Sequence, residues 1–417
     1  MYDIRKPNEN DYPELVRIVA EAYPGIGVFT EEARKKTEER LRKAGDDKRL
    51  QYYAAFSDDE MVGLMRLHDF EMNVHGVKML AGGVGNVAVD LVHKKAHVAK
   101  ELVEFYLDHY EQKNAPMAVL WPFRHDFYRK MGFGLGAKTH RYAIKPQDLP
   151  NVGDKNKVRF LTAADVLAMN DCYNRYVPTR SGLIYEHEIL WKRYFENQQK
   201  TRFVGYEDEG KLQGFFCYEF ASGKAEGFLD NNMEISWMIY ESSDALLGML
   251  SFLHAQLDQV NRVVLCTPDN DFYFMLNDVT NGSGNMFPSV NHESHISGVG
   301  IMYRVLSVRR LFEALADHDF GGVNMRLKLT IEDSLWPKNA GEYCLEFVDG
   351  RASIVESAEV DCEVGMDIAE FSSMVLGAVG FKSLLTYRLA TISDDGLAND
   401  VDRAFACAEK PLCLTGF

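Results

Sequence analysis

The first 145 residues alternate between runs typical of β-strands and runs typical of helices. A short strand at YDIRKP precedes a helix with one apolar face, and polar turns then separate three β-rich runs. After Asp90 the apolar spacing becomes helical until Asn114, and a strand from Met117 to Leu120 leads into the glycine-containing run FYRKMGFG. The predicted order of elements is therefore β-α-β-β-β-α-β-α-β.

Two further changes of pattern divide the rest of the chain. The run IKPQDLPNVGDKNK interrupts both periodicities, and from Val158 a second series of elements repeats the layout of the first. From about residue 302 short strands lead to the helix DIAEFSSMVLG. We predict a mixed α/β and α+β protein with three domains, at residues 1–148, 149–301 and 302–417, the second a diverged copy of the first.

Composition narrows the class of protein. A length of 417 residues suits two or three cores. A net charge of −16 argues against a general nucleic-acid or anionic-membrane surface and fits a cationic or amine-bearing substrate, although an acidic surface that keeps the protein in solution is the simpler cause of most of the charge. The seven cysteines form no CxxC pair, which is unlike a disulfide framework and indicates a reducing cytoplasm. Because neither a signal-peptide core nor an apolar run of membrane-spanning length occurs, we expect a cytoplasmic protein that contacts no membrane.

The candidate chemistry lies in the run GGVGNVAVDLVHKKAHVAKEL. Here a strand passes through a short basic loop into the start of a helix, where free N–H groups bind phosphate oxygens and Lys94 and Lys95 add positive charge. This arrangement predicts a pyrophosphate site, although two lysines on a solvated surface are the simpler alternative. Gly83, Gly85 and Ala88 also match the dinucleotide pattern G-x-G-x-x-A, but they lie before or inside the strand, so we reject that reading.

The strand, loop and helix, followed by another strand and FYRKMGFG, resemble the GCN5-related N-acetyltransferase (GNAT) fold. That superfamily has the loop pattern Q/R-x-x-G-x-G/A, and the corresponding run here begins with lysine, has His97 in place of the glycine and ends in alanine. The resemblance implies that acetyl-CoA binds here, with the strand holding its pantetheine arm and the loop its phosphates. The implied cofactor-binding residues are Val87, Ala88, Val89, Lys94, Lys95, Ala96, His97, Val98, Ala99, Lys100, Phe123 and Arg124.

Read together, GGVGNVAV, FYRKMGFG and the ending PLCLTGF resemble the enhanced intracellular survival (Eis) family of aminoglycoside N-acetyltransferases over the whole chain. This resemblance implies acetyl transfer from acetyl-CoA to primary amines of aminoglycoside-like, polyamine or lysine substrates. It further implies a homo-oligomer, since family members form hexamers, and a third domain that resembles a sterol carrier protein.

The same resemblance assigns two catalytic groups. Tyr128 corresponds to the family's general acid, and a phenol with a pKa near 10 is protonated at neutral pH and able to supply a proton to a departing thiolate. The C-terminal carboxylate of Phe417 corresponds to the general base, holding the amine and accepting its proton. The alternatives are an aromatic ring packed under a turn at Gly132 and a frayed terminus, although the apolar tail is poorly suited to water.

Other sites are weaker in this sequence. Residues 225–260 contain no lysine or arginine, so the second domain lacks a comparable phosphate site and is expected to be structural. His292 and His295 lack an obvious third ligand, and we expect no metal. The alternative function is a non-catalytic protein that binds a lipid or acyl-CoA in its third domain, with the acetyltransferase folds as scaffolding.

Overall fold

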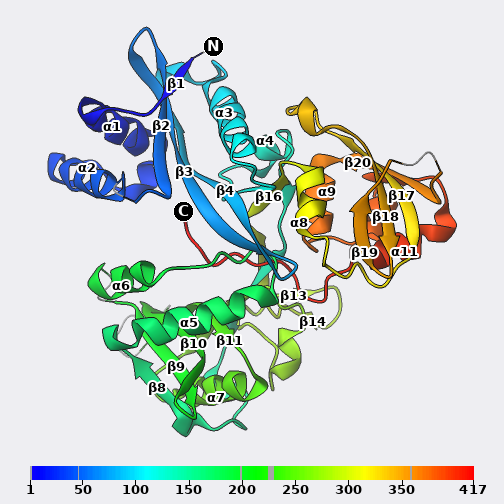
Figure 1. Ribbon diagram of the computed structural model, residues 1–417. Helices are drawn as coiled ribbons and strands as arrows, with labels where there is room; N and C mark the ends of the chain where they lie inside the picture. The colour runs from blue at the N-terminus through cyan, green and yellow to red at the C-terminus, as the bar shows by residue number, and fades with distance from the viewer. Residues whose placement is uncertain (1, 46, 198–199, 224–229, 357–358) are drawn as a thin grey trace.

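The computed structural model describes residues 2–45, 47–197, 200–223, 230–356 and 359–417. Figure 1 shows three parts of the chain, the first in blue and cyan, the second in green and the third in yellow and red. Each part is built on its own sheet, and the C-terminus returns to the first part.

The first part of the chain forms a sheet with helices on both faces. Its elements are β1 (Asp3–Arg5), α1 (Tyr12–Ala22), α2 (Glu31–Gly45), β2 (Leu50–Ser57), β3 (Glu60–Val74), β4 (Val77–Val89), α3 (Val98–Gln112), β5 (Met117–Leu120), α4 (His125–Arg129) and β6 (Gly134–Leu135). The sheet has the order β1-β2-β3-β4-β5-β16-β6, antiparallel except where β4 and β5 run parallel. Helix α1 contributes to an apolar core on one face of the sheet, and α3 contributes to a second core on the other face.

This arrangement confirms the predicted order of elements, with one helix added. Sequence analysis assigned no element to residues 24–49, where the structure forms α2. The helix was missed because it is strongly charged, and only Thr37 and Leu41 among its residues are buried. An apolar face this narrow leaves almost no helical periodicity to detect.

The second part repeats the design. Its elements are β7 (Lys138–Ile144), β8 (Val158–Leu161), α5 (Val166–Tyr176), α6 (Glu188–Asn197), β9 (Arg202–Asp208), β10 (Lys211–Ser222), β11 (Asn231–Tyr240), α7 (Ser243–His254), β12 (Arg262–Thr267), β13 (Met286–Phe287), β14 (Asn291–His292) and β15 (Ile296–Val299). The main sheet has the order β15-β7-β12-β11-β10-β9-β8, and β11 and β12 form its parallel pair.

The sheets cross the predicted domain limits at residues 148 and 301. Strand β7 lies before the first limit but pairs with β12 and β15 of the second sheet. Strand β16 (Met302–Val305) lies beyond the second limit but pairs with β5 and β6 of the first sheet. Each of these two strands therefore pairs across a predicted limit, because local periodicity does not reveal which distant strand will be the partner.

The third part is an α+β unit with a five-stranded sheet in the order β19-β18-β17-β20-β21. Its elements are α8 (Val308–Ala314), β17 (Met325–Glu332), β18 (Gly341–Val348), β19 (Arg351–Ile354), β20 (Cys362–Asp367), α9 (Ile368–Val375), α10 (Phe381–Thr386), β21 (Ala390–Ile392) and α11 (Ala398–Ala404). One continuous apolar core joins this sheet to Met72 and Val74 of β3, Met79 of β4 and the buried strand β16. The first and third parts therefore form a single packed unit.

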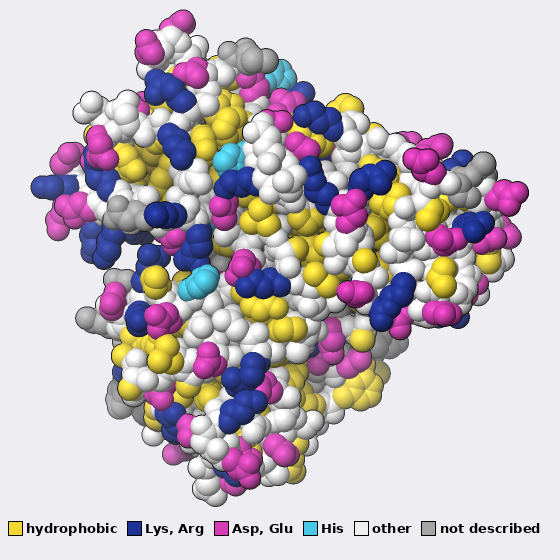
Figure 2. Space-filling view, in the orientation of Figure 1, with side chains coloured by type: hydrophobic (Ala, Val, Ile, Leu, Met, Phe, Trp, Pro, Cys, Tyr) yellow, Lys and Arg dark blue, Asp and Glu magenta, His cyan; other side chains and the backbone are white. Residues whose placement is uncertain are grey.

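The face of the molecule in Figure 2 shows acidic and basic side chains interspersed rather than segregated. No helix in the described part of the chain is both long and apolar enough to cross a membrane.

Candidate active site

A cleft opens where the first sheet splits between β4 and β5. The two strands pair only from Ala81 to Val84 on β4, and β4 then continues to Val89 beyond the end of β5. Asn86 has a positive φ of 50°, and the register with β3 shifts at this point, as in a β-bulge. The split leaves the last residues of β4 facing open space instead of a neighbouring strand.

This cleft has a volume of about 710 Å³ and brings together ten of the twelve predicted cofactor-binding residues. The ten are Val87, Val89, Lys94, Lys95, His97, Val98, Ala99, Lys100, Phe123 and Arg124. Ala88 and Ala96 do not line it. Ala88 instead packs into the core under α1, and the carbonyl of Ala96 accepts a hydrogen bond from the Tyr2 hydroxyl at 2.9 Å.

The cleft also has four lining residues that sequence analysis missed, Ala22, Tyr23, His93 and Phe127. Tyr23 ends α1, and its hydroxyl donates to the carbonyl of Val87 at 2.7 Å. No local signal marks Tyr23, because it reaches the cleft only through the packing of α1 against β4. His93 and Phe127 each lie close in the chain to a predicted residue, so a wider window around those motifs would have included them.

Two residues of the basic loop adopt a left-handed backbone conformation. Lys95 and His97 have φ values of 69° and 61°, in the left-handed region where glycine is favoured. His97 immediately precedes α3, and its side chain makes no capping hydrogen bond. The histidine thus occupies the glycine position at a backbone cost of about 1–2 kcal/mol, and its side chain leaves the first N–H groups of α3 uncapped.

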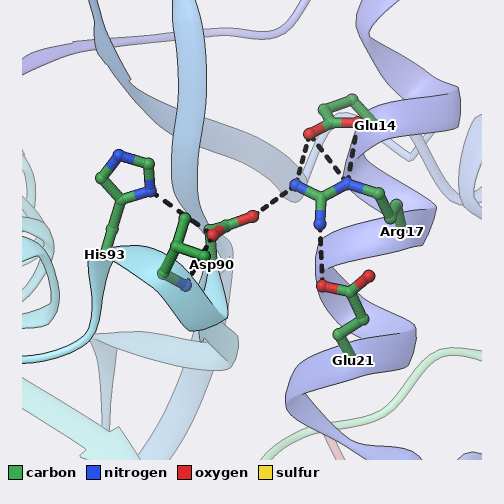
Figure 3. Close-up of polar contacts among 6 residues, drawn as sticks. Glu14, Arg17, Glu21, Asp90 and His93 are labelled. Carbon is green, nitrogen blue, oxygen red and sulfur yellow. Dashed lines mark hydrogen bonds and ion pairs between the residues drawn. The ribbon is translucent and has the colours of Figure 1, made fainter.

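An ion-pair network fixes the end of β4 beside this loop (Figure 3). Buried Asp90 accepts a hydrogen bond from the Val92 amide at 2.9 Å and pairs with Arg17 of α1. The Arg17 guanidinium holds the pKa of the Asp90 carboxyl below its usual range. Arg17 also binds Glu14 and Glu21 of its own helix, while the ring of His93 lies 3.4 Å from Asp90. The start of the basic loop is thereby anchored to α1.

Tyr128 lies in α4, next to the aromatic wall of the cleft. It is 2% exposed, and its ring contacts Phe123 and Phe127, which line the cleft, with centroids 5.6 and 5.1 Å away. Tyr128 itself is not among the lining residues. Burial raises the pKa of its phenol above the ordinary value, which keeps the hydroxyl protonated at neutral pH.

The C-terminal tail is anchored along its last six residues. The amide of Leu412 donates to the carbonyl of Ser181 at 2.9 Å, and Leu412 and Leu414 pack against the second domain. Thr415 accepts from the Trp121 indole at 3.1 Å through its carbonyl and donates to Glu186 at 2.6 Å through its hydroxyl. A frayed terminus is therefore wrong for this chain.

The C-terminal tail places Phe417 beside β4, the strand whose last residues line the cleft. The Phe417 ring packs against Phe70 and His68 of β3, with centroids 4.9 and 5.5 Å away. A Cβ atom added at Gly85 of β4 would lie 2.9 Å from the terminal carboxyl carbon. Figure 1 shows the terminus beside this sheet, facing the second domain. Contacts between residues distant in the chain thus place the C-terminal carboxylate beside Gly85, two residues before Val87 in β4.

The second domain offers no similar anion site at the matching helix. Helix α7 follows β11, and the hydroxyl of Ser242 caps its N-terminus by accepting from the Ala245 amide at 3.2 Å. Glu241, just before it, binds Arg175 and Lys211. The start of α7 is thus capped by a side chain and follows an acidic residue, whereas α3 follows the basic loop of Lys94 and Lys95 and its N-cap residue, His97, makes no capping hydrogen bond.

The histidines considered in the sequence lie in the β14–β15 region, where His295 packs edge-on against His140 with centroids 4.6 Å apart. Within the described ranges, no three histidine, cysteine, aspartate or glutamate side chains are placed to hold a metal ion.

Comparison with known families assigns each part of the chain. Residues 3–136 and 178–305 each match a model described as an acetyltransferase (GNAT) domain, and residues 311–414 match a sterol carrier protein domain. A search of curated proteins finds no match.

Solved structures share the fold over the full length of both chains. They include a GCN5-related N-acetyltransferase from Kribbella flavida (19% identity, TM-score 0.77) and one from Anabaena variabilis ATCC 29413 (15%, 0.79). Eis1 from Mycobacterium abscessus is similar to the same extent (17%, 0.76), again with 100% of each chain covered.

The chain is therefore an acetyl-CoA-dependent acyltransferase built on the GNAT fold. Two GNAT domains followed by a sterol carrier protein domain give it the Eis-type architecture, so the predicted family resemblance and fold class are confirmed. The matches to acetyltransferase domains favour acetyl transfer over the alternative of a non-catalytic protein that binds a lipid or acyl-CoA.

Proposed function

We propose that this protein transfers the acetyl group of acetyl-CoA to primary amines of aminoglycoside-like, polyamine or lysine substrates, in the first domain alone. The observation that carries the proposal is the C-terminal carboxylate beside Gly85, on the strand whose next residues line the cleft. A fixed negative charge at this point would bind a cationic amine close to the thioester. We also propose a cytoplasmic homo-oligomer.

The residues of the cleft suit acetyl-CoA. Lys94, Lys95 and Lys100 surround the start of α3, where positive side chains and N–H groups attract phosphate oxygens. The apolar edge formed by Val87 and Val89 would hold the pantetheine arm. Bound here, acetyl-CoA supplies the activated acyl group, and the chain supplies binding, orientation and proton transfer.

Two groups of this chain would move protons. The carboxylate of Phe417 would hold the ammonium and accept its proton through water, since a terminal carboxylate with a reference pKa of about 3.3–3.7 is a weak base. Tyr128 would supply a proton to the departing sulfur. Its burial favours the protonated phenol, which is the form that an acid requires.

A three-way comparison tests this mechanism. The native-ended protein, a form extended by a few glycines after Phe417, and Tyr128→Phe are each measured for acetylation of spermidine and kanamycin, for CoA binding and for melting temperature. We expect the extension to reduce acetylation strongly and Tyr128→Phe to reduce it by about 10²–10⁴-fold, both with CoA affinity retained. Wild-type acetylation by the extended form would exclude the carboxylate, and wild-type acetylation by Tyr128→Phe would exclude the phenol.

A further inference from the structure

The turn that follows Tyr128 is in direct contact with the third domain. We call residues 128–134 the tyrosine turn. Gly132 in this turn has a φ of +77°, and a Cβ atom there would lie 1.5 Å from a guanidinium nitrogen of Arg304. A Cβ atom at Gly134 would lie 2.1 Å from the carbonyl oxygen of Ala369 in α9. Both glycines are therefore required for a close backbone approach.

A buried ion pair between Arg304 of the first sheet and Asp333 of the third domain joins this turn to the third domain. Arg304 of β16 donates to the carbonyl of Met131 at 2.6 Å and to Asp333, which follows β17, at 2.6 Å. Both side chains are buried, 0% and 1% exposed. The amides of Met131 and Phe133 in turn donate to the carbonyl of Tyr128 at 2.9 and 3.1 Å. Asp333 is thus linked to Tyr128 through Arg304 and the backbone of Met131.

Stability alone does not explain this pair. A buried ion pair costs desolvation that its attraction barely repays, and replacement by apolar residues is often neutral or stabilising. Within the described residues, the Nε atom of Arg304 is also buried without a hydrogen-bond partner. The pair does fix the orientation of the Arg304 guanidinium relative to the Met131 carbonyl, because the planar guanidinium donates hydrogen bonds only in set directions.

A second ion pair joins the third domain to the same turn, next to Tyr128. Arg129, the residue after Tyr128, lies 2.5 Å from Glu370 of α9. The first and third domains are already joined by their shared core and by a pair between Arg310 of α8 and Glu111 of α3, 3.4 Å apart. The contacts at Arg129 and Arg304 differ from that pair because they converge on the tyrosine turn.

We propose that the third domain positions the Tyr128 hydroxyl for catalysis through the Asp333–Arg304 and Glu370–Arg129 pairs. This inference rests on the proposed role of Tyr128 as the acid. Asp333, Arg304, Glu370 and Arg129 are positioning residues, since they act through the backbone of the turn and not on the substrate. The sterol carrier protein domain thereby serves acetyl transfer itself.

The test is a set of double-mutant cycles in the full chain. Asp333→Asn and Glu370→Gln are each made in the wild-type and Tyr128→Phe backgrounds, with Glu111→Gln as the matched control at the same domain interface. For each variant, kcat, KM for acetyl-CoA, CoA affinity and melting temperature are measured. If burial prevents Asp333→Asn from folding, Glu370→Gln, whose partner Arg129 is 42% exposed, decides the question.

In the wild-type background we expect kcat to fall by about 10-fold to 10²-fold with KM and CoA affinity unchanged, as for a misplaced catalytic group. In the Tyr128→Phe background the same changes should alter kcat by less than about twofold, because groups acting as a unit are not additive. Glu111→Gln should leave kcat unchanged in both.

If Asp333→Asn and Glu370→Gln lower kcat equally in the two backgrounds, the positioning role is overturned while Tyr128 remains the acid. The same conclusion follows if Glu111→Gln lowers kcat as much as they do. Wild-type turnover by Tyr128→Phe would overturn the acid assignment and this inference with it.

Discussion

Gly85→Ala is the smallest change that displaces the C-terminal carboxylate. The added methyl would lie 2.9 Å from the carboxyl carbon of Phe417 and 3.1 Å from its oxygen, whereas ordinary packing begins at 3.4 Å. The carboxyl group must therefore move by about 0.5 Å. The remaining neighbour, Nη2 of Arg66, lies at 3.5 Å and need not move. The strain falls on the tail alone.

The expected effect of Gly85→Ala on activity is large and its expected effect on stability is small. A misplacement of about 1 Å at a reacting centre can cost about 10²-fold, so half of that shift predicts a fall in kcat of roughly 10-fold, or about 1.4 kcal/mol of barrier. Gly85 does not have a positive φ, and alanine there lowers the entropy of the unfolded chain, a gain of about 0.4–1 kcal/mol that offsets the strain. The melting temperature should therefore change little.

The assay is the initial rate of spermidine acetylation at saturating acetyl-CoA, with CoA affinity measured by calorimetry and melting temperature measured on the same samples. Gly298→Ala is the matched control, since it also adds a methyl to a strand but meets nothing within 4 Å. Wild-type kcat in Gly85→Ala would refute the argument that the position of the carboxylate matters. A loss of kcat in both variants would show that the effect is not specific to the terminus.

Two further predictions concern binding and pH. Lys94→Glu combined with Lys95→Glu should abolish the single CoA site per chain that calorimetry is expected to show, because both lysines line the cleft. Two equivalent sites, or unchanged binding, would contradict the phosphate assignment. Burial raises the pKa of Glu186, which accepts from Thr415, to about 7, so the folded state holds a proton that the unfolded state loses near pH 4.5. The free energy of unfolding of the wild-type protein should therefore fall, relative to that of Glu186→Gln, as pH rises from about 4.5 to about 7, and should then level off. Denaturant titrations at several pH values measure this difference. Parallel pH curves for the two proteins would disprove the prediction.

Local sequence determined the part of the site that is continuous in the chain. Strand β4, the basic loop and α3 follow one another without interruption, so periodicity, loop charge and helix start were sufficient to predict the cleft's basic wall. The order of elements in the first domain was readable for the same reason, since each element carries its own apolar pattern. Only α2 was missed, because its charged surface gives no such pattern.

Tertiary structure decided everything that depends on distant partners. Whether β7 and β16 join the neighbouring sheets depends on pairing across long sequence separations, which hydrophobic patterns do not encode. Tyr23 enters the cleft because α1 packs on β4, and Arg304 reaches the tyrosine turn because β16 inserts beside β5. The apolar tail could be read from the sequence, but its place beside Gly85 follows from contacts with two domains that exist only once the chain has folded.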